Sequence, residues 1–154
     1  AALPHLRAQG SGVLLQIGSI AGRVTTPFAG LYAASKAALA ALTEAWHEEL
    51  APFGVESIIL DAASYPTNIG ANATFAQSEP YAAAFGAYVG AISAQPVGDP
   101  GEVAAAVVAL VETPAGQRPR RTVIAPAEQA TAVGLLNRTA AEVALAVKAG
   151  MGLR

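Results

Sequence analysis

The sequence predicts an α/β fold with a parallel sheet, because short β-prone runs alternate with helical segments along the chain. The runs at 13–17 and 55–60 are almost continuously apolar, as strands covered on both faces are, and a third run follows at 121–125. Segments with helical periodicity separate the three runs, at residues 31–51 and 101–112. Strands that alternate with helices in this order lie parallel in one sheet.

The first half of the chain is expected to contain a helix end, a strand, a loop and a long helix, in this order: residues 1–8, 13–17, 18–30 and 31–51. Gln9 and Gly10 end the first helix. The long helix contains no Gly or Pro, and its large apolar residues recur at spacings of three and four: Leu39, Leu42, Trp46 and Leu50. Pro52 and Gly54 end it just before the second strand.

The second half is expected to begin with a long excursion from the sheet. Residues 64–70 have the composition of a loop, and 72–94 form one or two Ala-rich helices, so we interpret 64–98 as a flap. Asp99 as a cap and Pro100 in the first turn introduce the helix at 101–112. The remaining elements are a loop at 113–119, a strand at 121–125 and a helix at 127–148 with a break near Gly134.

Composition indicates one globular domain and excludes several classes of function. Of 154 residues, 53% are hydrophobic and 13% charged, and the net charge of −2 offers no basic surface for nucleic acid. The absence of Cys excludes disulfides and thiolate nucleophiles, and two histidines leave little for a metal site. The uncharged stretch at 81–94 is too short to cross a membrane. No basic start precedes an apolar run at the N-terminus, so we expect a cytoplasmic protein.

Three polar residues around the first strand and the long helix can carry acid–base chemistry. Tyr32 and Lys36 lie four residues apart, which places both side chains on one face of a helix. A phenol is a poor proton donor or acceptor at neutral pH, and a neighbouring ammonium stabilises its anionic form. Ser19 follows the first strand, at the sheet edge where parallel α/β proteins gather ligand-binding residues, and its hydroxyl can polarise a carbonyl oxygen.

Two other arrangements do not predict a site. Ser19 does not lie in a G-x-S-x-G turn, since Ile17 stands where the first Gly belongs, and a hydrolase triad is therefore not expected. His47, Glu48 and Glu49 are adjacent on a helix, an arrangement typical of a solvated surface rather than of metal ligands, so we predict no metal site.

The segments GSIAG, with Ser19, and YAASK, from Tyr32 to Lys36, resemble the active-site half of the short-chain dehydrogenase/reductase family. Flanking segments resemble the family's last three strands and their helices, which implies a Rossmann-like parallel sheet of which this chain holds the last three strands. By this resemblance residues 1–154 form the C-terminal portion of a dinucleotide-binding catalytic domain.

The resemblance implies an NAD(P)-dependent oxidoreductase that interconverts a ketone and a secondary alcohol, with NAD or NADP as cofactor. Tyr32 then transfers the proton, Lys36 assists Tyr32 and holds the nicotinamide ribose, and Ser19 orients the substrate oxygen. Thr67 matches the family's cofactor-binding Thr, although Ala62 and Ala63 replace the usual Pro-Gly before it. Family members pair through the long helix, which implies a homodimer or homotetramer.

Aromatic residues concentrate in the expected flap: Tyr65, Phe75, Tyr81, Phe85 and Tyr88. They favour a small apolar carbonyl or alcohol substrate. No glycine-rich G-x-x-x-G-x-G loop is present, so we expect a further segment, of the same polypeptide, to supply it and to cover the edge of the first strand. The alternative is a truncated, non-catalytic remnant that acts as a binding or interaction module.

Overall fold

The computed structural model describes residues 2–72, 79–95 and 98–153, and its centre is a parallel sheet. The described strands are β1 (Gly12–Ser19), β2 (Val55–Ala62) and β3 (Arg121–Ile124), in the spatial order β1-β2-β3. β1 pairs with β2 from Gly12↔Val55 to Ser19↔Ala62, and β2 pairs with β3 from Ile59↔Arg121 to Ala62↔Ile124. The parallel α/β fold predicted from the sequence is confirmed, and the carboxyl ends of all three strands meet at one edge.

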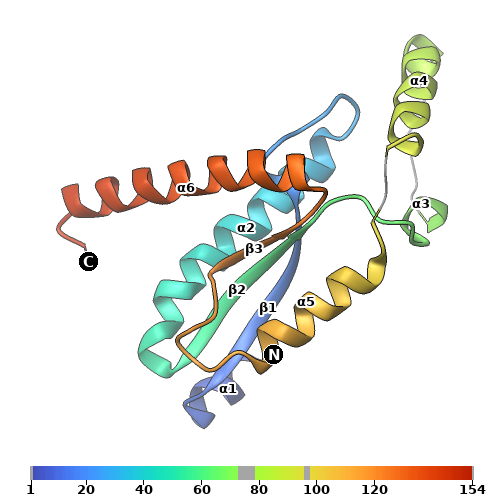
Figure 1. Ribbon diagram of the computed structural model, residues 1–154. Helices are drawn as coiled ribbons and strands as arrows, with labels where there is room; N and C mark the ends of the chain where they lie inside the picture. Colours follow the sequence, from blue (N-terminus) through green and yellow to red (C-terminus); the bar gives the residue numbers. More distant parts are fainter. Residues whose placement is uncertain (1, 73–78, 96–97, 154) are drawn as a thin grey trace.

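Helices cover both faces of this sheet (Figure 1). The long helix α2 (Gly30–Leu50) lies on one face, and α5 (Pro100–Glu112) lies on the other. Ile58 and Leu60 of β2 are fully buried and pack with Leu110 of α5, because alternate side chains of a strand point to the same face. The Asp99 side chain accepts a hydrogen bond from Gly101 N at 2.9 Å and caps α5, as predicted.

The buried face of α2 differs from the apolar stripe that the sequence suggested. Its buried residues are Ala33, Ala40, Thr43 and Leu50, whereas Leu42 of the predicted stripe is 44% exposed and Trp46 is half-buried. Small side chains let the helix lie close to the sheet, and they displace the larger residues to its flank. Only Leu50 belongs to both sets, so the helix predicted from the sequence is confirmed, and most of its apolar stripe lies outside the face that the sheet buries.

The remaining helices are short or peripheral. The chain begins with α1 (Leu3–Gln9), which ends at Gly10 in the left-handed conformation as expected. Turns η1 (Ile20–Gly22) and η2 (Ala51–Phe53) follow β1 and α2. The segments after β2 are α3 (Ile69–Asn72), η3 (Glu79–Tyr81) and α4 (Ala82–Ser93). In Figure 1, α4 projects from the body of the molecule. Residues 73–78, part of the helical region predicted at 72–94, lie outside the described residues.

The last helix, α6 (Ala127–Gly150), is continuous, so the predicted break near Gly134 is wrong. One Gly inside a helix costs only about 1 kcal/mol relative to Ala, and no Pro accompanies it here. Within the described part of the chain, no helix combines the length and apolar character that crossing a membrane requires.

We expect Leu60→Ala to lower the free energy of unfolding by about 3 kcal/mol, because Leu60 is fully buried between the sheet and α5. Urea denaturation followed by circular dichroism measures this change. The matched control is Leu145→Ala on α6, where the side chain is 67% exposed and the change should stay within about 0.5 kcal/mol. Equal effects of the two substitutions would show that Leu60 is not part of the core.

Candidate active site

Tyr32 and Lys36 lie one turn apart near the N-terminal end of α2. The Lys36 ammonium donates a hydrogen bond to the backbone oxygen of Ile17, at 3.1 Å, and lies 5.8 Å from the centre of the Tyr32 ring. Lys36 is half-buried, whereas Tyr32 is 43% exposed. The hydrogen bond to Ile17 holds the Lys36 side chain at the carboxyl end of β1 and leaves two further N–H donors of the ammonium.

Ser19 is the last residue of β1 and the first polar group of the turn that follows. Its Oγ accepts a hydrogen bond from Ala21 N at 3.2 Å and so caps η1, and the residue is 9% exposed. Gly22 ends this turn against α2, where an added Cβ would lie 3.0 Å from the Lys36 carbonyl carbon. The turn after Ser19 and the Lys36 backbone are therefore in contact, and the absence of a side chain at Gly22 permits it.

A chain of charged groups that no sequence pattern indicated lies beside the end of β2. Asp61 is 1% exposed and forms an ion pair with Arg121 of β3. Burial raises the pKa of Asp61 above its ordinary value, although Arg121, Arg23 and the Ser19 backbone N–H oppose this rise. Glu44 of α2 connects the two arginines, at 2.6 Å from Arg121 and 3.0 Å from Arg23.

Thr67, the expected cofactor ligand, lies on the loop that follows β2. It is exposed, and its Oγ1 accepts a hydrogen bond from Ile69 N at 3.4 Å, at the start of α3. Tyr65 precedes it and packs against Gly98, where a Cβ would lie 2.7 Å from the ring. Burial and the neighbouring Glu102 raise the pKa of Tyr65. The two ends of the predicted flap, 64–98, are therefore in contact at Tyr65 and Gly98.

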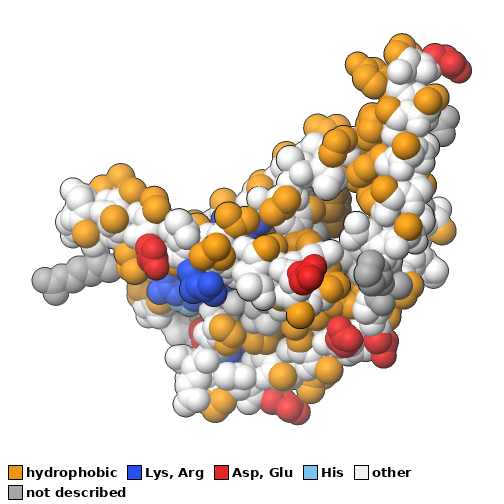
Figure 2. Space-filling view, turned by 45° about the horizontal axis from the view of Figure 1, so that its top comes forward, with side chains coloured by type: hydrophobic (Ala, Val, Ile, Leu, Met, Phe, Trp, Pro, Cys, Tyr) orange, Lys and Arg blue, Asp and Glu red, His pale blue; other side chains and the backbone are white. Residues whose placement is uncertain are grey.

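Phe28 connects the loop before Tyr32 to α4, a role that no sequence pattern indicated. Its ring centre lies 5.6 Å from those of Phe85 and Tyr88 and 6.5 Å from that of Tyr81. Phe28 has a φ of 63°, a conformation that is uncommon for a residue other than Gly. The hydroxyls of Thr26 and Tyr88 also lie 3.2 Å apart. Figure 2 shows hydrophobic side chains along α4, which projects at the upper right, and on the surface that faces it.

His47 has a structural role, and the solvated surface expected for it is wrong. The side chain is half-buried, and its Nδ1 lies 3.0 Å from the backbone oxygen of Ser57 in the central strand. Glu48 instead pairs with Arg120 at 2.9 Å and Lys148 at 2.7 Å. The hydrogen bond from Lys148 lowers the pKa of Glu48. Among the described residues no three His, Asp or Glu side chains gather as a metal site would require.

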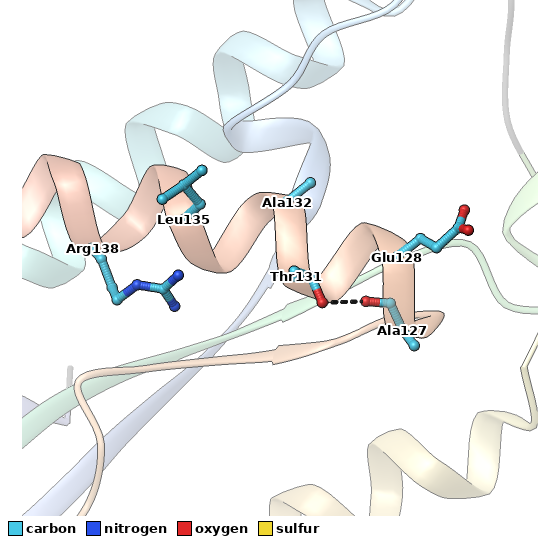
Figure 3. Close-up of a pocket in the computed structure, with 6 residues that line it drawn as sticks. All are labelled: Ala127, Glu128, Thr131, Ala132, Leu135 and Arg138. Carbon is cyan, nitrogen blue, oxygen red and sulfur yellow. Dashed lines mark hydrogen bonds between the residues drawn. The ribbon is translucent and has the colours of Figure 1, made fainter.

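A shallow hollow lies on the surface of α6 (Figure 3). Its lining comes from one helix: Ala127, Glu128, Thr131, Ala132, Leu135 and Arg138. The Thr131 hydroxyl donates to the Ala127 backbone oxygen at 2.8 Å, so its polar group is already satisfied within the helix. None of the candidate catalytic residues contributes to this hollow.

Similarity to known structures covers nearly all of the chain. A short-chain dehydrogenase from Streptomyces avermitilis superposes with a TM-score of 0.68 and 28% identity, over 99% of this chain and 56% of its own. A short chain dehydrogenase from Burkholderia cenocepacia J2315, solved in complex with NADP, has a TM-score of 0.61 and 22% identity, over 96% of this chain and 51% of its own. The chain thus spans about half the length of these two proteins.

Sequence similarity to known proteins covers about half of the chain. An uncharacterized oxidoreductase of Bacillus subtilis, YusZ, is 36% identical over 67 residues, which are 44% of this chain and 24% of the relative. The human 17-beta-hydroxysteroid dehydrogenase type 1 is 41% identical over 59 residues, 38% of this chain and 18% of the relative. The family profile described as short chain dehydrogenase matches residues 1–78, half of the chain. The chain therefore belongs to the short-chain dehydrogenase/reductase family.

Proposed function

We propose that this chain carries the catalytic residues of an NAD(P)-dependent oxidoreductase that interconverts a ketone and a secondary alcohol. The observation that carries the proposal is the position of the Lys36 ammonium, 5.8 Å from the Tyr32 ring centre and hydrogen-bonded at the end of β1. Ser19 ends the same strand, two residues after the hydrogen-bonded Ile17. The family supports an oxidoreductase, and the name of the human relative, a hydroxysteroid dehydrogenase, supports an alcohol as substrate.

In carbonyl reduction the Ser19 hydroxyl donates a hydrogen bond to the substrate oxygen and holds it toward Tyr32. A reduced nicotinamide, held by Tyr32, Lys36 and Thr67, would supply the hydride that the carbonyl carbon accepts. Tyr32 Oη gives its proton to the oxygen as negative charge develops there, and the Lys36 ammonium stabilises the charge left on the phenol. In alcohol oxidation the same groups act in reverse, with the Tyr32 oxygen as the base.

The hydrogen-bond donors of Lys36 suit NAD or NADP as the cofactor. After its bond to Ile17, Lys36 retains two N–H donors, which match the adjacent hydroxyls of a ribose. Tyr32 and Thr67 complete the proposed cofactor contacts from this chain. We assign residues 1–154 to the C-terminal portion of one dinucleotide-binding catalytic domain. The oxidoreductase activity is proposed for the complete protein that contains this domain.

We propose that 64–98 is a substrate flap and that the substrate is a small apolar carbonyl or alcohol. The contact between Tyr65 and Gly98 supports this role, because it brings the two ends of the segment together. The contacts of Phe28 with three aromatic rings support it as well, because they place α4 beside the loop that leads to Tyr32. Phe75, the remaining aromatic of the predicted flap, lies outside the described residues.

The exposed flank of α2 supports a homodimer or homotetramer. Leu42 is 44% exposed and Trp46 is half-buried, so a second copy can cover the side chains that the sheet leaves free. A cytoplasmic location and the absence of nucleic acid and membrane partners remain predictions from composition.

We expect the complete protein to enhance the fluorescence of NADPH or NADH and to oxidise one of them with a small aryl ketone such as acetophenone. The control is the Ser19→Ala variant, which should bind the reduced cofactor as well as the unmodified protein and reduce the ketone more slowly. A protein with a mass near 15.4 kDa that changes the fluorescence of neither cofactor would support the non-catalytic interaction module instead.

A further inference from the structure

The proposed mechanism leaves one buried charge unexplained, the carboxylate of Asp61. Asp61 is the last residue but one of β2 and pairs in register with Gly18, the neighbour of Ser19. It is 1% exposed, and its partner Arg121 has a side chain that is 10% exposed. Burying an ion pair costs several kcal/mol of desolvation, and apolar residues often stabilise a fold equally well. Stability alone therefore gives no reason for this pair.

Gly18 shows what the carboxylate does to the backbone. A Cβ at Gly18 would overlap Oδ1 of Asp61 and would lie 2.8 Å from Cδ1 of Ile59. The Asp61 carboxylate therefore occupies the space beside the Gly18 backbone that a side chain would otherwise fill. Because an interior is close-packed, a group in van der Waals contact with a backbone restricts how that backbone can move.

Asp61 is connected, through Arg121 and Glu44, to three other segments of the fold. Arg121 lies on β3, Arg23 on the loop just after η1, and Glu44 on α2, the helix that carries Tyr32 and Lys36. Arg121 contacts both Asp61 and Glu44, and Glu44 contacts Arg23. Asp61 is thus the buried end of a series of ion pairs that joins β2, β3, the loop after η1 and α2.

We propose that Asp61 is a positioning residue for Ser19, which it holds by filling the space beside Gly18 and by connecting it through Arg121 and Glu44 to α2. The inference rests on the proposed function, since it assigns Ser19 a substrate-orienting role. Asp61 does not touch the substrate. Without its charge, the ion pair with Arg121 is lost, and the Gly18–Ser19 backbone is no longer fixed through Arg121 and Glu44 relative to Tyr32.

The test is Asp61→Asn in the complete protein, which keeps the size of the side chain and removes its charge. We expect kcat for acetophenone reduction to fall about tenfold or more while KM for the reduced nicotinamide changes less than about twofold, because misplacement of an orienting group affects the chemical step. The amide resonances of Ser19 and Ala21 should shift in a proton–nitrogen NMR spectrum, a readout that does not depend on turnover.

The matched control is Glu56→Gln, at the opposite end of the same strand. Glu56 forms an ion pair with Arg118 at 2.8 Å, and like the Asp61–Arg121 pair it is largely buried, with side chains that are 17% and 12% exposed. This substitution should lower the melting temperature without changing kcat or the Ser19 and Ala21 resonances. If both variants lower kcat equally, Asp61 acts only through stability and the proposal is overturned.

Glu44→Gln gives an independent test if Asp61→Asn does not fold. Glu44 has a side chain that is 54% exposed, so its replacement by Gln should be tolerated, yet it removes the charge that pairs with Arg23 and Arg121. We expect kcat to fall about threefold; an unchanged kcat overturns the proposal.

Tyr32→Phe distinguishes a failure of the Asp61 proposal from a failure of the proposed function. If Tyr32→Phe abolishes ketone reduction and the Asp61 and Glu44 variants leave the rate of reduction unchanged, only the role of Asp61 fails. If Tyr32→Phe leaves ketone reduction intact, the proposed function fails.

Discussion

Tyr32→Phe is expected to lower kcat by roughly 10²- to 10⁴-fold, because it removes the group that transfers the proton. Tyr32 is 43% exposed, so the loss of one hydroxyl should change neither folding nor packing appreciably. The fluorescence titration with NADPH or NADH should give nearly the same dissociation constant as the unmodified protein. Steady-state reduction of acetophenone, measured with each cofactor at saturation, gives kcat.

Ser35→Ala is the control for the loss of a hydroxyl on the same turn of α2. The Ser35 hydroxyl donates to the Tyr32 backbone oxygen at 2.7 Å and so has its partner within the helix. We expect this variant to keep kcat within about twofold of the unmodified protein. A Tyr32→Phe variant that keeps most of its kcat would show that another group moves the proton, and the assignment of Tyr32 would be wrong.

The arrangement of strands and helices was predictable from the sequence because local rules determine it. The four-residue spacing of Tyr32 and Lys36 has one geometric outcome on a helix, and the structure places both on α2. Asp99 and Pro100 predicted the start of α5 within one residue for the same reason. Gly54 ends the turn after α2 with a φ of 68°, a conformation in which Gly is favoured.

The surroundings of the site were not predictable, because they depend on contacts between distant residues. Asp61 and Arg121 are 60 positions apart, and an isolated Asp at the end of an apolar strand carries no sign of its partner. Phe28 adopts a left-handed conformation among the rings of α4, which no local pattern of its own loop requires. The inner face of α2 is likewise not marked by its large apolar residues, because small and polar side chains form most of it.

The repeat that does mark the inner face of α2 combines small and polar residues. It runs at spacings of three and four through Ala33, Lys36, Ala40, Thr43, His47 and Leu50. Four of these are buried, and the other two donate hydrogen bonds to backbone oxygens of the sheet, Lys36 to that of Ile17 and His47 to that of Ser57. Lys36 thus lies on the sheet side of the helix, which is why its ammonium reaches the end of β1.

Lys36→Met is expected to impair both the chemical step and cofactor binding. Met has similar length but no charge, so the hydrogen bond to Ile17 and the positive charge near the Tyr32 ring are both lost. Without that charge, the negative charge that develops on the Tyr32 oxygen in the transition state is less well stabilised, and we expect kcat to fall about 10²-fold. Loss of a charge-assisted hydrogen bond to the ribose should also weaken reduced-cofactor binding by tenfold or more, equivalent to about 1.4 kcal/mol or more.

Lys148→Met provides the matched control, since Lys36 and Lys148 are the two lysines of the chain. Lys148 pairs with Glu48 at 2.7 Å, away from the candidate catalytic residues, so its loss should reduce stability slightly and leave kcat and cofactor binding unchanged. Fluorescence titration and steady-state kinetics on the two variants separate the two roles of Lys36. If kcat falls and cofactor affinity stays the same, Lys36 assists Tyr32 without holding the ribose. Loss of affinity with kcat retained at saturating cofactor would instead remove its role in proton transfer, because only the charge beside Tyr32 acts on the chemical step.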